Sequence, residues 1–224
     1  MNVIILPSLL AADFGRLGEE ARRAEAAGAD ALHLDIMDGH FVPNLSMGPD
    51  VVKMADRTVE MPLSVHLMLT NPDQYLKAFI DAGADSLLIH IEAACNVPDA
   101  LQRIRDLGVR PGIVINPDTE AELVFPVLGL VDEVLCMTVH PGYGGQSFMP
   151  EVLPKIRAIR DEAGAHGATE LDIMVDGGID DSTAAQCAAQ GANAFVAGTS
   201  LYGATDMAAS VEALRRSAGE ALSV

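Results

Sequence analysis

A short phrase recurs along the chain: EAAGADALHLD at 25–35, IDAGADSLLIH at 80–90 and AAQGANAFVAG at 188–198. In each copy an alanine-rich stretch ends at glycine, and Ala followed by Asp or Asn leads into an apolar run. Glycine just after a helix can adopt a positive φ and end it, so each copy predicts a joint between a helix and the next strand. A looser copy, RDLGVRPGIVIN, lies at 105–116. Repeated joints of this kind indicate βα units.

Outward from these joints, apolar runs predict eight strands, near 3–7, 31–36, 63–67, 85–90, 111–115, 132–138, 171–175 and 193–197. Helical stretches alternate with them, near 15–27, 49–56, 72–82, 97–107, 119–127, 151–165, 182–190 and 205–218. Near-continuous Val, Ile and Leu runs indicate strands buried on both faces. Eight alternations in 224 residues favour a closed (β/α)8 barrel, the TIM-barrel architecture, as one domain over 1–224. An open doubly wound sheet usually has fewer strands.

The composition restricts the partners. Lys and Arg number 14 against 32 Asp and Glu, which gives a net charge of −18. This acidity favours solubility and argues against nucleic acid or an anionic membrane surface, because both need cationic contacts. An anionic ligand would have to be held by backbone N–H groups and a metal. Three cysteines without C-x-x-C spacing predict reduced thiols in a cytoplasmic protein, and we expect neither a signal peptide nor a membrane span.

Four side chains that can bind a metal lie at predicted strand ends. They are His33 and Asp35 in ALHLDIMDG, His66 in LSVHLML and Asp176 in LDIMVDGGI. Residues two apart on a strand share a face, and loops at the carboxyl ends of parallel strands converge. Two imidazoles and two carboxylates suit one divalent ion such as Zn²⁺, Fe²⁺, Mn²⁺ or Co²⁺. A single histidine on an apolar strand would indicate a core residue, so the prediction rests on the four together.

His90 also ends a predicted strand, two residues before Glu92. We leave both outside the predicted ligand set, because Glu92 could serve either to orient a ligand or to make a structural bond. Met37, Met68 and Met137 also lie at or just past strand ends. Their thioethers could form an apolar wall beside a reacting centre or belong to ordinary barrel packing.

Glycines follow several of the predicted strands. Gly177 and Gly178 follow Asp176, and Gly198 and Thr199 follow the last strand. Loops after the seventh and eighth strands are the usual phosphate site of this architecture, where backbone N–H groups can approach an anion without Lys or Arg. The segment Gly142-Tyr143-Gly144-Gly145 predicts a loop that folds over a ligand. Ser8 ends the first strand and could hydrogen-bond a substrate hydroxyl.

These motifs have a familiar order and spacing. The sequence resembles the ribulose-phosphate 3-epimerase family through PSLLAADF (7–14), HLDIMDGHFVPNLSMG (33–48), HLML (66–69), MTVHPGYGGQSF (137–148), VDGGI (175–179) and VAGTSL (196–201). The resemblance spans essentially the whole chain, and DGHFVPN and HPG-aromatic-GGQ-x-F are highly specific. It implies a (β/α)8 barrel of the ribulose-phosphate binding type that interconverts D-ribulose 5-phosphate and D-xylulose 5-phosphate with a divalent metal.

The resemblance also implies roles for individual residues. The metal ligands would be His33, Asp35, His66 and Asp176, with Asp35 and Asp176 as the acid–base pair. Ser8 and His66 would lie near the substrate, the 142–145 loop would cover it, and Gly177, Gly178, Gly198 and Thr199 would contact its phosphate. Family members are commonly homo-oligomers, dimers or hexamers, and we expect the same here.

Three segments depart from the family pattern. Thr199 and Ser200 follow Gly198 where Gly-Ser-Ala is usual, Tyr143 replaces the commoner Phe, and EAACNVPD (92–99) is less typical. None touches the four predicted ligands, but they leave alternatives open. One is a 3-epimerase of a six-carbon ketose phosphate such as D-allulose 6-phosphate. The others are a metal-free sugar-phosphate binding protein and a metal-dependent aldolase. An aldolase would normally have a Schiff-base Lys or a carboxylate-binding Arg at a strand end, and the sequence shows neither.

Overall fold

The structure, a computed structural model, describes residues 2–222. Its parallel strands are β1 Ile4–Pro7, β2 Leu32–Met37, β3 Leu63–Met68, β4 Ser86–His90, β5 Arg110–Ile115, β6 Glu133–Met137, β7 Asp172–Asp176 and β8 Ala194–Ala197. They form an eight-stranded sheet in the order β1-β8-β7-β6-β5-β4-β3-β2. A parallel bridge between Ser8 and His33 joins the two ends of that order. The predicted (β/α)8 barrel is therefore confirmed, and residues 1 and 223–224 of the predicted domain lie outside the described residues.

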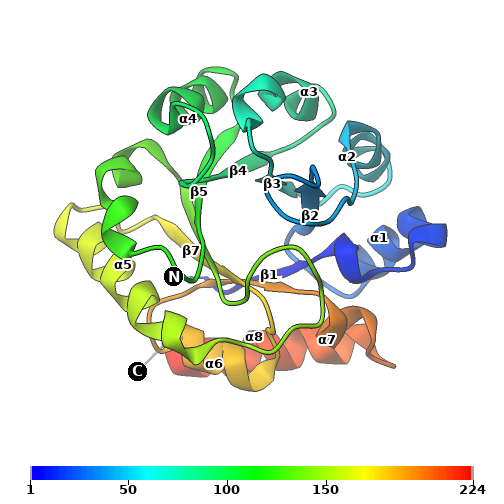
Figure 1. The fold of residues 1–224 in the computed structure, drawn as a ribbon. Helices are drawn as coiled ribbons and strands as arrows, with labels where there is room; N and C mark the ends of the chain where they lie inside the picture. The colour runs from blue at the N-terminus through cyan, green and yellow to red at the C-terminus, as the bar shows by residue number, and fades with distance from the viewer. Residues whose placement is uncertain (1, 223–224) are drawn as a thin grey trace.

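The helices surround the strands (Figure 1). The α-helices are α1 Leu17–Ala26, α2 Pro49–Asp56, α3 Leu76–Ile80, α4 Val97–Asp106, α5 Leu153–Ala165, α6 Asp181–Ala188, α7 Thr199–Tyr202 and α8 Met207–Leu222. The 3-10 helices are η1 Leu9–Ala11, η2 Phe14–Arg16, η3 Pro72–Gln74, η4 Ala121–Leu123, η5 Phe125–Leu130 and η6 Pro150–Val152. None of the helices within residues 2–222 combines the length and hydrophobicity of a membrane-spanning segment.

One helical prediction was wrong in type. The stretch 119–127 forms η4 and η5 in place of an α-helix. Pro126 lies in the first turn of η5, where its missing N–H prevents continuation from η4, and Gly129 weakens the turn that follows. The short helix α7 was not predicted, because four residues leave no periodicity to detect.

The three copies of the repeated phrase form the same local structure. Its glycines all adopt a positive φ, 82° at Gly28, 108° at Gly83 and 103° at Gly191, as the helix–strand joints require. The acidic or amide side chain two residues later accepts a backbone N–H at the start of the preceding strand: Asp30 from Ile5, Asp85 from Leu63 and Asn193 from Ile173. Each copy therefore ends a helix and ties its strand to the neighbouring one.

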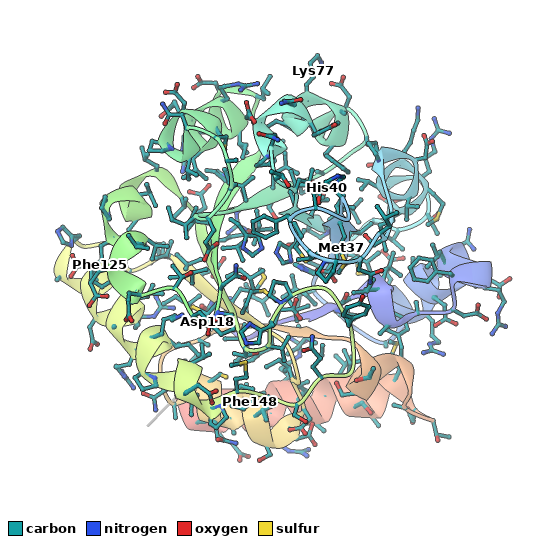
Figure 2. All side chains as sticks on the ribbon, in the orientation of Figure 1. Met37, His40, Lys77, Asp118, Phe125 and Phe148 are labelled. Atoms are coloured by element: carbon teal, nitrogen blue, oxygen red, sulfur yellow. The ribbon has the colours of Figure 1, made fainter. Side chains whose placement is uncertain are left out.

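Strand alternation separates the core from the site. In β2 all six residues are buried, but Leu32, Leu34 and Ile36 belong to the large cluster between sheet and helices. His33 and Asp35 alternate with them and therefore point into the barrel. A second apolar cluster, which includes Leu88, Val114 and Leu135, fills the barrel interior. Figure 2 shows Met37 inside the ring of helices, whereas Lys77 lies at its outer edge.

Candidate active site at the mouth of the barrel

The four predicted ligands converge. One ligand atom from each of His33, Asp35, His66 and Asp176 lies within 4.8 Å of every other. They come from β2, β3 and β7, and Asp176 is the last residue of its strand. The two histidines are 0% exposed and Asp35 is 3% exposed, whereas Asp176 is half-buried, so three of the four side chains are shielded from bulk solvent. Strand register and barrel closure bring the predicted set together.

The donor atoms fit a cation. His66 Nδ1 lies 3.0 Å from Asp35 Oδ1, and His33 Nε2 lies 3.4 Å from the same oxygen. Within residues 2–222, no hydrogen-bond partner reaches His33 Nε2, although the atom is buried. A buried nitrogen without a partner is costly unless something else occupies its lone pair. Two imidazole nitrogens and two carboxylates therefore form a cluster that could hold one divalent ion.

The two carboxylates have very different environments. Burial raises the pKa of Asp35, but the adjacent His33 and His66 outweigh burial and hold that pKa well below its usual range. Burial and the negative charge of Asp35 raise the pKa of Asp176 to about 7, against a smaller opposing effect of His33. Burial lowers the pKa of His66 to about 4. One carboxyl group therefore stays ionised while the other can take up or release a proton near neutral pH, as an acid–base pair requires.

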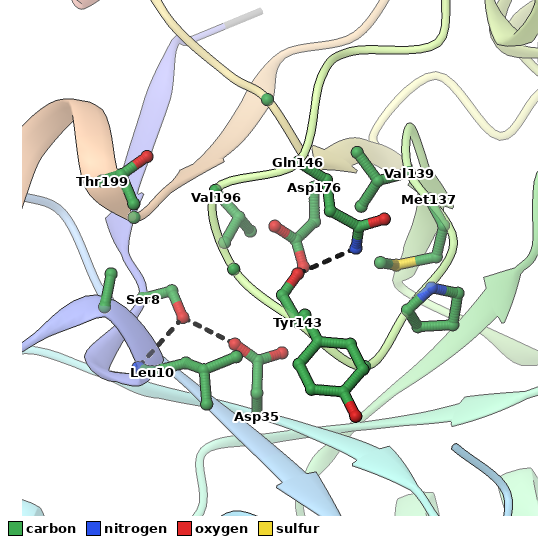
Figure 3. Close-up of a pocket in the computed structure, with 18 of the residues that line it drawn as sticks. Ser8, Leu10, Asp35, Met137, Val139, Tyr143, Gln146, Asp176, Val196 and Thr199 are labelled. Atoms are coloured by element: carbon green, nitrogen blue, oxygen red, sulfur yellow. Dashed lines mark hydrogen bonds between the residues drawn. The ribbon is translucent and has the colours of Figure 1, made fainter. Parts of the chain in front are cut away.

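Ser8 contacts the site directly. Its Oγ donates to Asp35 Oδ2 at 2.6 Å and accepts the backbone N–H of Leu10 at 3.3 Å (Figure 3). The hydroxyl therefore holds the carboxylate that two histidines also contact. Sequence reasoning placed Ser8 near the substrate but did not foresee this bond, because the two residues are 27 positions apart.

A cavity of about 70 Å³ lies over the cluster. Nearly all the predicted substrate residues line it: Ser8, Gly142, Tyr143, Gly144, Gly145, Asp176, Gly177, Gly178, Gly198 and Thr199. His66 is absent from the lining and fully buried beneath it. Its place is therefore within the ligand cluster, with Asp35 between it and the cavity.

The cavity wall contains residues that the predicted substrate set omitted. Met37, Met68 and Met137 all line it, although each is less than 5% exposed, so they both pack the barrel and face the site. Gln146 also lines it. Its position within HPGYGGQSF was a signal, but no local pattern assigns that amide a role. Among the described residues 2–222, no Lys or Arg lines the cavity.

The glycines after β7 are tightly confined. Gly177 and Gly178 have φ of 123° and 64°. A Cβ on Gly177 would lie 2.5 Å from Val139 Cγ2, and one on Gly178 would lie 2.6 Å from the backbone nitrogen of Phe148. Side chains are thus excluded where the backbone approaches the cavity. The helix α6 that follows has its first N–H groups capped by Asp180, whereas Gly198 leaves the start of α7 without a side-chain cap.

Comparison with known proteins shows which family this chain is similar to. The model of the "Ribulose-phosphate 3 epimerase family" matches residues 4–202. The chain belongs to that family. It is 44% identical to a ribulose-phosphate 3-epimerase of Bacillus subtilis, over 95% of this chain and 98% of the relative. It is 47% identical to one of Mycobacterium bovis, over 97% and 94%. This chain is therefore an enzyme, an isomerase of the epimerase family.

Solved structures support the fold alone. A 3-keto-L-gulonate-6-phosphate decarboxylase from Vibrio cholerae matches with a TM-score of 0.74 and 13% identity, over 98% of both chains. An orotidine 5'-phosphate decarboxylase from Pyrococcus horikoshii matches with a TM-score of 0.71 and 14% identity, over 96% of this chain and 99% of that one. At such low identities the epimerase assignment rests on the family model and the curated relatives.

In this epimerase-family chain the loop after β6 crosses the mouth of the barrel (Figure 1), and its residues 141–146 line the cavity. Tyr143 Oη donates to the carbonyl of Pro43 at 2.8 Å, and Asn44 Nδ2 donates to the carbonyl of Gly142 at 2.7 Å. Gln146 Nε2 donates to the carbonyl of Tyr143 at 2.9 Å (Figure 3). The Tyr143 hydroxyl therefore ties this loop to the loop after β2.

His90 and Glu92 lie behind the cluster. His90 Nε2 is 2.8 Å from His66 Nε2, and His90 Nδ1 is 3.1 Å from Glu92 Oε2. Burial raises the pKa of Glu92, but bonds to His90, Thr119 and the Asn116 backbone outweigh burial and lower that pKa to about 2. The phenyl ring of Phe41 packs on His90, with ring centroids 4.6 Å apart. His90 thus lies next to the ligand set without belonging to it.

Proposed function

We propose that this enzyme is a metal-dependent ribulose-phosphate 3-epimerase that interconverts D-ribulose 5-phosphate and D-xylulose 5-phosphate. The observation that carries the proposal is that Asp35 and Asp176 line one cavity and share one ligand cluster with two buried histidines. Curated relatives named ribulose-phosphate 3-epimerase support the substrate.

Epimerisation at C3 of a 2-keto sugar phosphate removes a proton from one face of the carbon and returns one to the other. Asp35 or Asp176, whichever starts ionised, takes the proton as the C3–H bond breaks. The electron pair moves toward the C2 carbonyl oxygen. The other carboxyl group then donates its proton to the opposite face of C3, so that the two residues exchange protonation states. Because β8 and β1 separate β7 from β2 around the barrel, the two carboxyl groups approach the substrate from different sides.

Other residues of the chain would position the substrate. His33, Asp35, His66 and Asp176 would hold the divalent ion, Zn²⁺, Fe²⁺, Mn²⁺ or Co²⁺, which when bound supplies Lewis-acid stabilisation of negative charge on the substrate oxygens. Backbone N–H groups at Gly177, Gly178, Gly198 and Thr199 would hold the phosphate. Ser8 keeps Asp35 oriented, and the 142–145 loop excludes water. We also propose a cytoplasmic homo-oligomer, dimer or hexamer, whose mass light scattering would measure.

The deciding experiment is an assay of D-ribulose 5-phosphate conversion before and after chelation, with metal add-back. We expect chelation to abolish activity and a divalent ion to restore it. Product formed in D₂O should carry deuterium at C3, and product without deuterium would contradict proton abstraction. Greater turnover of D-allulose 6-phosphate would reassign the substrate to a six-carbon ketose phosphate. No activity on either sugar with any of the four ions would contradict the proposal.

Asp35→Asn and Asp176→Asn should each lower kcat by several orders of magnitude, because each removes one of the two proton-transfer groups. Each change also weakens the ligand set, so metal content is measured beside activity. A variant that kept its metal and turned over near the normal rate would remove that residue from the acid–base pair. Asp85→Asn, at the opposite end of the barrel, serves as the carboxylate-to-amide control.

A further inference from the structure

Two buried histidine rings meet behind the ligand cluster. The Nε2 atoms of His66 and His90 are 2.8 Å apart, and their rings stack with centroids 5.0 Å apart. Both side chains are 0% exposed, so water does not mediate this contact. A hydrogen bond between two ring nitrogens needs one ring to donate and the other to accept. The direction of that bond decides which nitrogen of His66 keeps a lone pair for the ligand cluster.

Glu92 imposes the direction. Its Oε1 accepts the backbone N–H of Asn116 at 3.0 Å, and its Oε2 lies 3.1 Å from His90 Nδ1. An ionised carboxylate only accepts, so His90 donates from Nδ1. A neutral His90 then has a bare Nε2, which accepts from Nε2–H of His66. His66 then presents a bare Nδ1, 3.0 Å from Asp35 Oδ1, and because the ionised Asp35 also only accepts, this arrangement is stable with a cation in place of a proton beside those two atoms.

We infer that Glu92 and His90 are positioning residues that fix the tautomer of His66 and so present its Nδ1 as a metal ligand. The inference rests on the metal site of the proposed function and adds two residues to it. Hydrogen bonds from outer residues commonly set ligand tautomers in this way. His33 lacks such control, because its Nδ1 faces the Ser64 hydroxyl at 3.2 Å, and a hydroxyl can both donate and accept.

The test is Glu92→Gln, which keeps the shape and removes the obligatory acceptor. The new amide must keep its oxygen toward the fixed N–H of Asn116, so its NH₂ group turns toward His90 Nδ1. The chain then reverses: His90 donates from Nε2, and His66 places its proton on Nδ1, where the metal should bind. We expect the Zn²⁺ dissociation constant, measured by competition with a chromophoric chelator, to rise roughly 10- to 100-fold.

A second readout separates positioning from mere structural support. In metal-free protein labelled with ¹⁵N-histidine, long-range ¹H–¹⁵N spectra should show His90 protonated on Nδ1 in the wild type and on Nε2 in Glu92→Gln. Asp85→Asn is the matched control, since it makes the same chemical change just before β4, where Asp85 Oδ2 accepts the N–H of Leu63 at 2.8 Å. It should lower stability and leave both the Zn²⁺ affinity and the His90 tautomer unchanged.

An unchanged His90 tautomer, or an unchanged Zn²⁺ dissociation constant, in folded Glu92→Gln would overturn the inference. If that variant does not fold, His90→Phe replaces it, because a phenyl ring can still pack on Phe41 but cannot accept from His66. We expect the same loss of affinity there, and wild-type affinity would overturn the inference. If wild-type protein binds no divalent ion, the metal site of the proposed function fails, while the metal-free spectra still decide whether Glu92 sets the proton direction.

Discussion

Glu133 shows how strongly burial acts on a single residue outside the site. It is the first residue of β6 and is 4% exposed, with Oε1 3.2 Å from Arg110 Nη1. Burial raises its pKa from 4.5 to about 7, although Arg110 partly opposes the rise. The folded protein therefore keeps a proton on Glu133 at pH values where the unfolded chain releases it.

This shift predicts a pH dependence of stability. Well below pH 4.5, Glu133 is protonated in both the folded and the unfolded state and does not change the free energy of unfolding. Between about 4.5 and 7 the unfolded chain loses its proton first, so Glu133 lowers the free energy of unfolding as pH rises, by up to about 3 kcal/mol. Above about pH 7, Glu133 is ionised in both states, and the loss of unfolding free energy stays constant. Urea unfolding of Glu133→Gln should therefore show the variant gaining stability relative to wild type from pH 5 to 8.

The exposed Glu170 supplies the control for this comparison. Glu170→Gln makes the same chemical change at an exposed side chain and should keep a constant stability difference from wild type across the same pH range. A constant difference for Glu133→Gln as well would show that the carboxyl group is solvated.

At the scale of elements, the β7–α6 loop depends on glycine. Gly178→Ala would force an alanine to φ 64° and bring its Cβ to 2.6 Å from the Phe148 nitrogen. We expect it to destabilise the protein by about 1–3 kcal/mol and to raise KM, since the loop must move. Gly164→Ala is the contrasting control, because Gly164 lies within α5 with open space around it. There alanine should stabilise by roughly 0.5–1 kcal/mol. Equal effects in urea unfolding would contradict this account.

The loop after β6 offers a second element-scale prediction. Tyr143→Phe removes the donor to Pro43 and leaves the ring, so the closed loop loses one neutral hydrogen bond worth about 0.5–1.5 kcal/mol. We expect KM to rise by a factor of roughly 2–10 with little change in overall stability. Tyr75→Phe, at an exposed tyrosine before α3, provides the control. Unchanged steady-state kinetics in Tyr143→Phe would show that the bond does not hold the loop.

The whole molecule carries a net charge of −18, and its substrate is an anion by our proposal. Long-range repulsion should slow their association until salt screens it. Raising ionic strength from roughly 0.01 M to 0.1 M shortens the Debye length from about 30 Å to about 10 Å. We expect kcat/KM for the sugar phosphate to rise over that range while kcat stays constant. A fall in kcat/KM would mean that the local potential of the phosphate loops outweighs the total charge, and circular dichroism would verify that folding is unaffected.

Much of this protein follows from local sequence pattern. Apolar runs and the Gly-Ala-Asp joints predicted eight strands, because period and turn chemistry act over a few residues. The two-residue spacing of His33 and Asp35 indicated that both face one side, and the structure places both inside the barrel. The segment 119–127 was misassigned because helix type depends on how a short, Pro-containing stretch packs.

Contacts across the barrel followed from no local pattern. The bond from Ser8 to Asp35, the tie from Tyr143 to Pro43 and the facing nitrogens of His66 and His90 join residues 24 to 100 positions apart. Their existence depends on strand register and on closure of the sheet between β1 and β2. Residue identity thus decides which chemistry is available, whereas the direction of each hydrogen bond and the pKa of each carboxyl group depend on which neighbours the folded barrel buries beside it.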